Sequence, residues 1–307
     1  MKAWQQEAIK LKEQGYSGRA IARILGRSKS SVNDFFYKYR ESTGYTTTIK
    51  QSGPKTLFID IETSPLFAAL WSMWQQGVGI NQIKSDWIIL SFCAKWGHSD
   101  EVIYKDLRGK VDKEDDSELV EELFHLLNEA DVVVAHNGRK FDVKKINARL
   151  LMNGFPKPSP FKIVDTLEIA KRQFAFTSNK LEYLTDKLCE TKKSKHAKFS
   201  GYELWAECLR DNIEAWDEMK SYNVLDVLSL EELYHVLSSW SNVIPNDALY
   251  VDDVLDMGEW EKYGFYFTSL GKYQVYRHKK TGVQRRSRVN LLPKEQRESL
   301  LLNMANS

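Results

Sequence analysis

Two carboxylates near the start of an apolar stretch have the residue types and spacing of a metal site. The phrase FIDIET places Asp60 and Glu62 two residues apart, so on a strand both side chains emerge on one face. Adjacent carboxylates repel each other unless a cation lies between them or they share a proton. Mg²⁺ and Mn²⁺ prefer such oxygen ligands. Taken alone, the pair is equally compatible with an exposed position at the end of a strand.

Two later phrases carry further acids. Asp142 ends HNGRKFD, where it opens a predicted helix and could simply be an acid favoured by the helix dipole. Tyr222 and Asp226 lie four residues apart in YNVLD and share one face of a predicted helix. Apolar residues surround Asp226, and burial of an unpaired carboxylate is costly. Together the phrases predict divalent ions that cleave a phosphodiester bond, and therefore a nuclease.

The segments between these phrases predict alternating strands and helices. Strands are predicted at residues 57–61, 87–96, 102–104 and 132–135. Helices are predicted at residues 114–129, 142–152, 166–174, 178–188 and about 212–240. This order favours an α/β domain with a central mixed sheet.

The first 45 residues predict three short helices with a tight glycine turn, as in a helix-turn-helix DNA-binding domain. Ser28 can cap the third helix. Residues suited to phosphate and base-edge contacts then face outward on or beside that helix: Arg27, Lys29, Ser31 and Asn33. A trihelical unit that docks on a protein is the alternative. Residues 46–54 form a polar linker.

Residues 258–307 alternate aromatic, polar and basic side chains, which predicts a small β-meander. Arg285 and Arg286 are candidates for nucleic-acid contact.

Charge is distributed unevenly along the 307 residues. Residues 1–50 and residues 258–307 each carry +6, so the remaining residues carry −10 within a net charge of +2. Two basic ends around an acidic centre fit a metal-binding catalytic domain with appendages that bind nucleic acid. Uneven charge without function is the alternative.

Several classes of protein are excluded by composition. No apolar run reaches the roughly 20 residues of a membrane helix, and the N-terminus has no apolar signal core. The three cysteines have no paired spacing, which indicates reduced thiols in the cytoplasm, or in the host cytoplasm if a phage encodes the chain.

The three acidic phrases, in order and spacing, resemble the motifs of the DEDD superfamily of 3′–5′ exonucleases. FIDIET resembles the first motif, NGRKFD the second, and YNVLD the third motif of the tyrosine subtype. The resemblance covers roughly residues 55–240, including VDTLEIAKRQF, SNKLEYL and GYELW, which are similar to stand-alone phage exonucleases related to polymerase proofreading domains. It implies an RNase H-like exonuclease domain over residues 55–245.

The resemblance also implies a two-metal mechanism with Mg²⁺ or Mn²⁺. In it, Asp60 bridges both ions, Glu62 and Asp226 complete the site of the attacking water, and Asp142 supports the second ion. Tyr222 orients the water.

The implied activity is hydrolysis of DNA from its 3′ end to 5′-mononucleotides, as proofreading or end trimming in phage DNA replication. The expected partners are single-stranded 3′ ends, duplex DNA at the helix-turn-helix, and a DNA polymerase. A 3′–5′ exoribonuclease is one alternative, because the motifs do not separate DNA from RNA. A catalytically inactive DNA-binding regulator or polymerase accessory is the other, although all five motif residues are present.

Further residues are candidates for holding the strand. Asn137, a polar residue at a strand end in the second motif, is a candidate for nucleic-acid binding, and Asn179 could contact the sugar-phosphate backbone. Phe67, Trp71 and Trp74 could stack on bases, or could equally belong to the core.

The C-terminal meander resembles the zinc-ribbon tail of related phage exonucleases, with one departure. His278 and Thr281 stand where the second cysteine pair would be, and no cysteine follows Cys208. A zinc site needs about four ligands, so we expect a ribbon without zinc.

Overall fold

The structure is a computed structural model. It describes residues 2–13, 18–28, 31–32, 35–36, 39, 53–74, 77–191, 198–246, 249–250 and 257–301. The chain divides into two compact units, one of residues 1–53 with 246–255 and one of residues 54–245 with 256–307. The domain boundaries given above remain predictions.

The first unit contains the helices α1 (Ala3–Glu13) and α2 (Gly18–Ile24), and the described residues 31–32, 35–36 and 39 are also helical. These elements close around a small hydrophobic core, whose buried members are Ala8, Leu11, Ile21, Ala22, Val32, Phe35 and Phe36. Aromatic packing adds to this core, because the Trp4 and Phe35 rings meet edge to face with centroids 5.4 Å apart.

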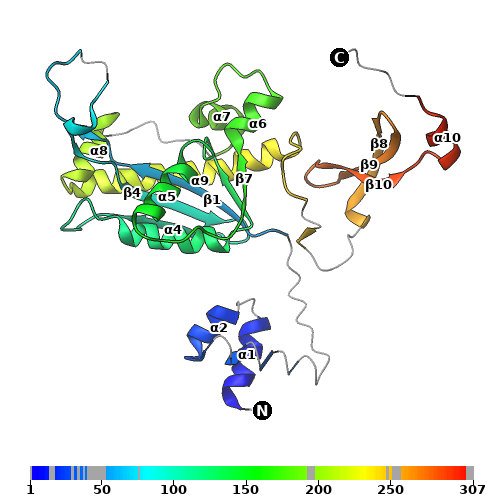
Figure 1. Cartoon of the computed structure of the whole chain (residues 1–307), viewed down its shortest axis with the longest axis horizontal. Coiled ribbons are helices and arrows are strands. Elements are labelled where there is room, and N and C mark those ends of the chain that lie inside the picture. Colours follow the sequence, from blue (N-terminus) through cyan, green and yellow to red (C-terminus); the bar gives the residue numbers. More distant parts are fainter. Residues whose placement is uncertain are drawn as a thin grey trace. The chain divides into compact units, whose positions relative to one another are not determined.

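The second unit is built on a five-stranded mixed sheet in the order β5-β4-β1-β6-β7. The strands are β1 (Thr56–Thr63), β4 (Ile89–Trp96), β5 (Val102–Asp106), β6 (Val132–Ala135) and β7 (Lys162–Asp165). β1 pairs antiparallel with β4 and parallel with β6, so the polarity of the sheet changes at β1 (Figure 1). The predicted α/β class with a central mixed sheet is confirmed.

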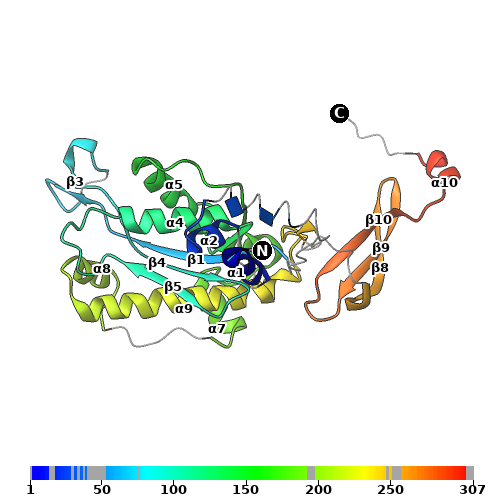
Figure 2. The ribbon, with the colours of Figure 1, turned by 90° about the horizontal axis from the view of Figure 1, so that it is seen from below.

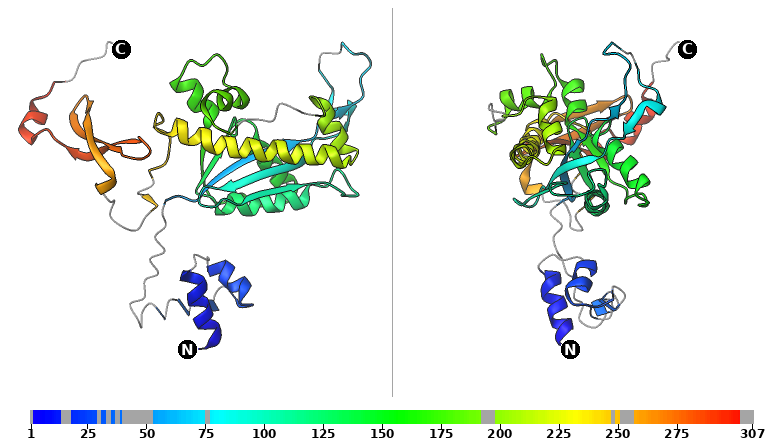
Figure 3. Two further views of the ribbon diagram at one scale, coloured as in Figure 1. Left: turned by 180° about the vertical axis from the view of Figure 1, so that it is seen from behind. Right: turned by 90° about the vertical axis from the view of Figure 1, so that its left-hand side faces the viewer.

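Helices cover both faces of this sheet. α4 (Ser117–Glu129) and α5 (Asp142–Met152) lie on one face, and the long helix α9 (Ile213–Ser238) lies on the other (Figure 2). α6 (Thr166–Gln173) and α7 (Leu181–Leu188) pack on the α9 side, because they share its hydrophobic cluster. Figure 3 shows α9 running lengthwise along the strands. α8 (Tyr202–Leu209) precedes it.

The two faces of β1 belong to different cores, as the alternation of a strand requires. Leu57, Ile59 and Ile61 join the cluster formed with α4 and α5. Phe58 joins the cluster formed with α9. Asp60 and Glu62 share the parity of Phe58, so both acids project toward the α9 face.

Some short elements were not predicted. They are β7, α8 and the hairpin of β2 (Phe67–Ala68) and β3 (Ile83–Ser85), which follows the first acidic phrase. Strands of two to four residues are too short to show a period of two. α7 begins at Leu181 and not at residue 178.

A separate antiparallel sheet follows in the order β10-β9-β8, as the predicted meander requires. Its strands are β8 (Trp260–Thr268), β9 (Gly271–His278) and β10 (Gln284–Asn290), and the short helix α10 (Lys294–Ser299) comes after them. In the described part of the chain, no helix is long and apolar enough to cross a membrane.

Candidate active site

Asp60 lies in the middle of β1, opposite Cys93 of β4, and faces α9. Asn223 of α9 donates a hydrogen bond from Nδ2 to Asp60 Oδ2 at 2.5 Å. Ser91 of β4 donates to Oδ1 of the same amide at 3.3 Å. The fully buried Asn223 therefore fixes the Asp60 carboxylate with a neutral donor. It was missed in the sequence, where an Asn beside Tyr222 carries no signal of its own.

Glu62 lies two residues further along β1, where α8 reaches it. The Trp205 indole Nε1 donates to Glu62 Oε2 at 3.2 Å. The Trp205 ring also meets the Tyr222 ring edge to face, with centroids 6.4 Å apart. Trp205 therefore links the first and third acidic phrases. The GYELW phrase around it was noted only for its family resemblance.

Asp142 begins α5 and is only 3% exposed. Its Oδ1 accepts a hydrogen bond from the backbone N–H of Ile61, between the two acids of β1, at 3.2 Å. The turn before it depends on Gly138, because a Cβ there would lie 2.3 Å from Ala135 Cβ. Asn137 adds a left-handed backbone conformation with φ of 70°. The HNGRKFD phrase is therefore a tight turn that places Asp142 next to β1.

A further buried acid, Asp165 at the end of β7, holds this turn in place. Its two carboxylate oxygens accept the backbone N–H groups of Asn137 at 2.9 Å and Arg139 at 3.1 Å. The same side chain caps α6 by accepting from Leu167 N at 3.0 Å. Asp165 is thus saturated by backbone donors and acts as a positioning residue.

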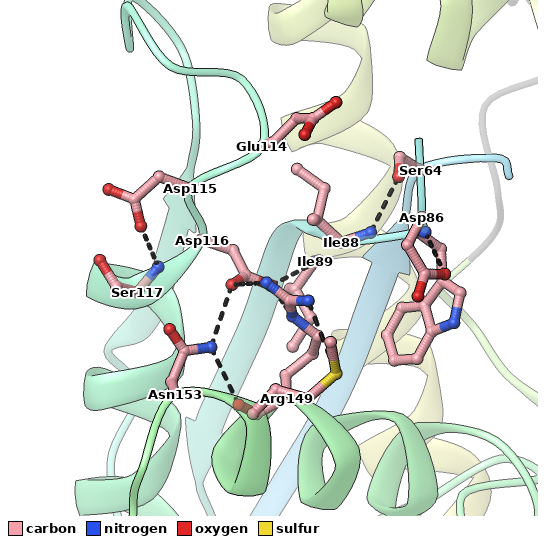
Figure 4. Close-up of polar contacts among 12 residues, drawn as sticks. Ser64, Asp86, Ile88, Ile89, Glu114, Asp115, Asp116, Ser117, Arg149 and Asn153 are labelled. Carbon is pink, nitrogen blue, oxygen red and sulfur yellow. Dashed lines mark hydrogen bonds and ion pairs between the residues drawn. The ribbon is translucent and has the colours of Figure 1, made fainter. Parts of the chain in front are cut away.

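The far end of α5 is held by a buried ion pair (Figure 4). Asp116 is fully buried at the start of α4. Its carboxylate accepts hydrogen bonds from Arg149 Nη2 at 2.6 Å and from Arg149 Nε at 2.7 Å. The N–H of Ile89 also donates to Asp116, at 3.0 Å. This pair ties α4, α5 and β4 together, so the helix that begins with Asp142 has a fixed position. No spacing in the sequence indicates it.

Tyr222 and Asp226 lie one turn apart on α9, and a side-chain hydrogen bond joins them. Burial raises the pKa of the Tyr222 hydroxyl, and the nearby charges of Asp226, Glu62 and Asp60 raise it further. The hydroxyl therefore keeps its proton at neutral pH and can act as a hydrogen-bond donor.

The carboxylates influence one another strongly. Burial raises the pKa of Asp60 well above its ordinary value, and the charges of Asp142, Glu62 and Asp226 raise it further. Burial raises the pKa of Asp142 to about 7, against the opposing hydrogen bond from Ile61 N–H. The structure thus brings the four predicted acids and Tyr222 into one cluster.

The donor set of this cluster fits a hard divalent cation, because it consists of carboxylate oxygens. A cation would also relieve the mutual repulsion that raises the pKa of Asp60. Across the described ranges, no group of three or more His, Cys, Asp or Glu is already arranged to hold a metal ion.

Asn137 and Asn179 come together at a cavity of about 480 Å³. His136 connects their two segments, because its Nε2 bonds to the Asn179 carbonyl oxygen at 2.9 Å. The other residues that line the cavity are apolar or basic: Leu167, Lys171, Lys180 and Leu181.

The aromatic residues after the first motif do not form a core. Trp71 is 96% exposed and Trp74 is 86% exposed, so the core interpretation is wrong for both. Phe67 is 40% exposed.

The remaining candidates for nucleic-acid contact lie near the two ends of the sequence, far from the acids along the chain. Ser31 N donates to Ser28 Oγ at 3.2 Å, as a helix cap requires, and the Arg27 guanidinium lies 5.4 Å from the centroid of the Trp4 ring. Lys29 and Asn33 lie outside the described residues.

In the C-terminal sheet, Arg285 Nη2 donates to the Pro245 carbonyl at 3.0 Å, and Arg286 lies over Tyr273. Thr281 N donates to His278 Nδ1 at 3.2 Å.

Comparison with known proteins identifies one family. A family model of the RNase H superfamily matches residues 57–238, from β1 to the end of α9, and so includes all four acids. No curated protein matches the chain. A solved family B DNA polymerase of the hyperthermophilic archaeon Pyrobaculum calidifontis is similar at 15% identity and a TM-score of 0.39. The match covers 62% of this chain and 26% of the polymerase chain, so this chain spans about a quarter of that polymerase.

Proposed function

Because this chain belongs to the RNase H superfamily, we propose that it is a metal-dependent nuclease that removes nucleotides from the 3′ end of DNA. The membership confirms the RNase H-like domain predicted from the sequence. The proposal adds the tyrosine subtype, the 3′–5′ polarity, and proofreading or end trimming in phage DNA replication beside a polymerase.

One observation carries the proposal. Burial raises the pKa of one carboxyl group, Asp60, and three further acids, Glu62, Asp142 and Asp226, raise it more. A fold gains nothing from gathering like charges in this way, because each carboxylate destabilises the others. Such a cluster is explained when the charge is matched by ligands that arrive from outside, as in hydrolysis of a phosphodiester by metal ions.

The chain's own residues then have separate tasks. Asp60, Glu62, Asp142 and Asp226 would hold two Mg²⁺ or Mn²⁺ ions, which when bound supply an activated water and neutralise charge on the phosphate. Tyr222, protonated at neutral pH, would donate a hydrogen bond that orients the water. Asn223 and Trp205 hold Asp60 and Glu62 in position through neutral donors.

The surroundings suit a nucleic-acid strand. The cavity beside the second motif carries Lys171 and Lys180, which can pair with backbone phosphates. Trp74, highly exposed in the segment after the first motif, offers a ring on which an unpaired base can stack. The exposed ring favours a frayed single-stranded end over an intact duplex, because only unpaired bases can stack on it.

A time course on 5′-labelled DNA tests the proposal. Single-stranded and mismatched duplex substrates are incubated with Mg²⁺, Mn²⁺ or EDTA, and the labelled products are separated by length. We expect a ladder that shortens one nucleotide at a time with metal and no change in EDTA. Early release of the label as a mononucleotide, or cleavage in EDTA, would contradict the proposal. A matched RNA strand separates the exonuclease of DNA from the exoribonuclease.

A further inference from the structure

The C-terminal sheet carries large aromatic side chains but forms no core. Four aromatic residues of β8 are half or more exposed: Tyr263 at 53%, Phe265 at 50%, Tyr266 at 51% and Phe267 at 65%. None of the residues described in this sheet belongs to any hydrophobic core cluster. Exposed aromatic side chains that stabilise no core mark a binding surface.

On one face, three side chains form a row across all three strands. Tyr266 of β8 pairs directly with Tyr273 of β9. The guanidinium carbon of Arg286, on β10, lies 4.2 Å from the centroid of the Tyr273 ring and 5.6 Å from that of Tyr266. We call Tyr266, Tyr273 and Arg286 the tyrosine row.

The backbone is adapted to this row. A Cβ on Gly271 would lie 2.7 Å from two atoms of the Tyr273 side chain. The Tyr273 ring can therefore lie over residue 271 of the same strand only because that residue is a glycine. Arg277 is four residues beyond Tyr273 and therefore shares its face. Its guanidinium carbon lies 5.3 Å from the centroid of the Tyr263 ring, which adds a second pair of ring and cation.

The opposite face differs in its cations. Lys272 Nζ lies 4.1 Å from the Phe265 ring centroid and 5.8 Å from that of Phe267, so one ammonium group serves both rings. Arg285, next to Arg286 and so on the opposite face, donates to the Pro245 carbonyl. The two arginines beside tyrosine rings, Arg277 and Arg286, thus lie on the face of the tyrosine row.

The charge of the segment indicates the ligand. Residues 258–307 carry ten Lys or Arg and four Asp or Glu, a net charge of +6, which suits a polyanion. Rings interleaved with cations bind unpaired nucleotides, because bases stack on the rings while cations pair with phosphates. Bases within a duplex are already stacked on each other and cannot use such rings.

We propose that the tyrosine row is a binding site for single-stranded nucleic acid. Bases stack on Tyr266 and Tyr273, the Arg286 guanidinium pairs with one phosphate, and Arg277 pairs with the next phosphate. This binding does not require hydrolysis, so it can be tested separately from the nuclease activity.

The test uses the full chain with Asp60→Asn, in EDTA, so that digestion cannot interfere. Fluorescence anisotropy with a labelled thymidine oligonucleotide measures affinity. We expect Tyr266→Ala and Tyr273→Ala each to weaken binding about tenfold, as loss of one stacked base does. The matched controls on the opposite face, Phe265→Ala and Phe267→Ala, should stay within about twofold, since the proposal places no base on that face. A uridine oligonucleotide compares RNA with DNA.

Salt dependence separates stacking from charge. Arg286→Gln should lower the slope of log K against log salt by roughly 0.7, the value for one phosphate of a single strand. Arg286→Lys should keep the slope, and Tyr266→Ala should leave it unchanged. Near-UV circular dichroism checks that each variant is folded, and Tyr266→Trp, which keeps a ring, should retain affinity.

Photo-crosslinking with a 5-iodouracil strand locates the contact, because other parts of the chain could also bind DNA. We expect crosslinked peptides that contain Tyr266 or Tyr273. The proposal would be overturned if these peptides were absent and the tyrosine variants bound normally. It would also be overturned by equal losses on both faces, by equal affinity for duplex, or by a protein partner that needs the row while the oligonucleotide does not.

Discussion

Asp116 and Asp142 are both almost completely buried in the second unit, but their surroundings differ. Asp116 faces the Arg149 guanidinium, which makes two hydrogen bonds to it, and it also accepts the Ile89 N–H (Figure 4). Asp142 accepts the neutral Ile61 N–H and lies beside Asp60. Within the described residues, no Lys or Arg pairs with either Asp60 or Asp142.

The difference separates a structural acid from a functional one. A buried carboxylate that serves the fold is balanced within the chain, by the Arg149 cation at Asp116 and by backbone N–H donors at Asp165. Asp60 and Asp142 accept hydrogen bonds from neutral donors, and burial and acidic neighbours raise their pKa values. A charge left uncompensated by the chain is matched by something that binds, which agrees with the proposed metal ions.

The largest expected effect is on stability at the ion pair. Arg149→Met leaves Asp116 buried without a cation, so the free energy of unfolding should fall by about 3–5 kcal/mol. Urea unfolding followed by circular dichroism measures it. The double variant Asp116→Leu with Arg149→Met should recover most of the loss, because it leaves no unpaired charge. If Arg149→Met were as stable as the wild type, Asp116 would not be a structural acid that depends on its cation.

At Asp60 we expect the opposite pattern, in which a substitution lowers activity but does not lower stability. Asp60→Asn should lower the rate of nucleotide release by roughly 10²–10³, or about 3–4 kcal/mol of transition-state stabilisation. In EDTA, the same variant should be at least as stable as the wild type, since it removes repulsion. Full activity, or a loss of stability equal to that of Arg149→Met, would show that Asp60 serves the fold.

Neutralising one acid of the cluster should have a smaller effect, seen in the pH dependence of stability, because the other three acids still titrate. The folded pKa of Asp142 is about 7, against an ordinary value of 3.8. The folded state therefore binds this proton more tightly, and the resulting stability is complete below about pH 4 and lost as the pH rises to 7. In EDTA, Asp142→Asn should lose less stability than the wild type between pH 4 and 7. Parallel curves from denaturant titrations would contradict this.

The smallest effect is expected at Tyr222. Tyr222→Phe removes one hydroxyl, and the net value of one hydrogen bond is about 0.5–1.5 kcal/mol, so the rate should fall about two- to tenfold. Binding of Mn²⁺ should be unchanged, because the variant keeps every carboxylate. A loss of Mn²⁺ affinity would assign the tyrosine to the metal site.

The acids themselves could be predicted from the sequence, because their spacing and apolar surroundings are local features. Asp60, Glu62 and Asp226 were proposed in this way and Asp142 through the family resemblance, while the sheet and the long helix that position them were predicted from the sequence pattern. The convergence of these acids depends on the topology, which the family resemblance supplied.

The supporting residues could not be predicted, because each acts on a partner distant in the sequence. Asn223 reaches Asp60, Trp205 reaches Glu62, and Asp165 holds the turn before Asp142. An Asn, a Trp or an Asp within a helix or at the end of a strand has many ordinary uses. Only the folded chain reveals which atom each one contacts.

The central claim is that the carboxylate cluster around Asp60 binds divalent cations. Thermal unfolding of the wild type, Asp60→Asn and Asp116→Leu with Arg149→Met, each with and without Mn²⁺ at neutral pH, tests it most directly. We predict that Mn²⁺ raises the melting temperature of the wild type and of the double variant, but has little effect on Asp60→Asn. An equal rise in all three proteins, or no rise in the wild type, would contradict the claim.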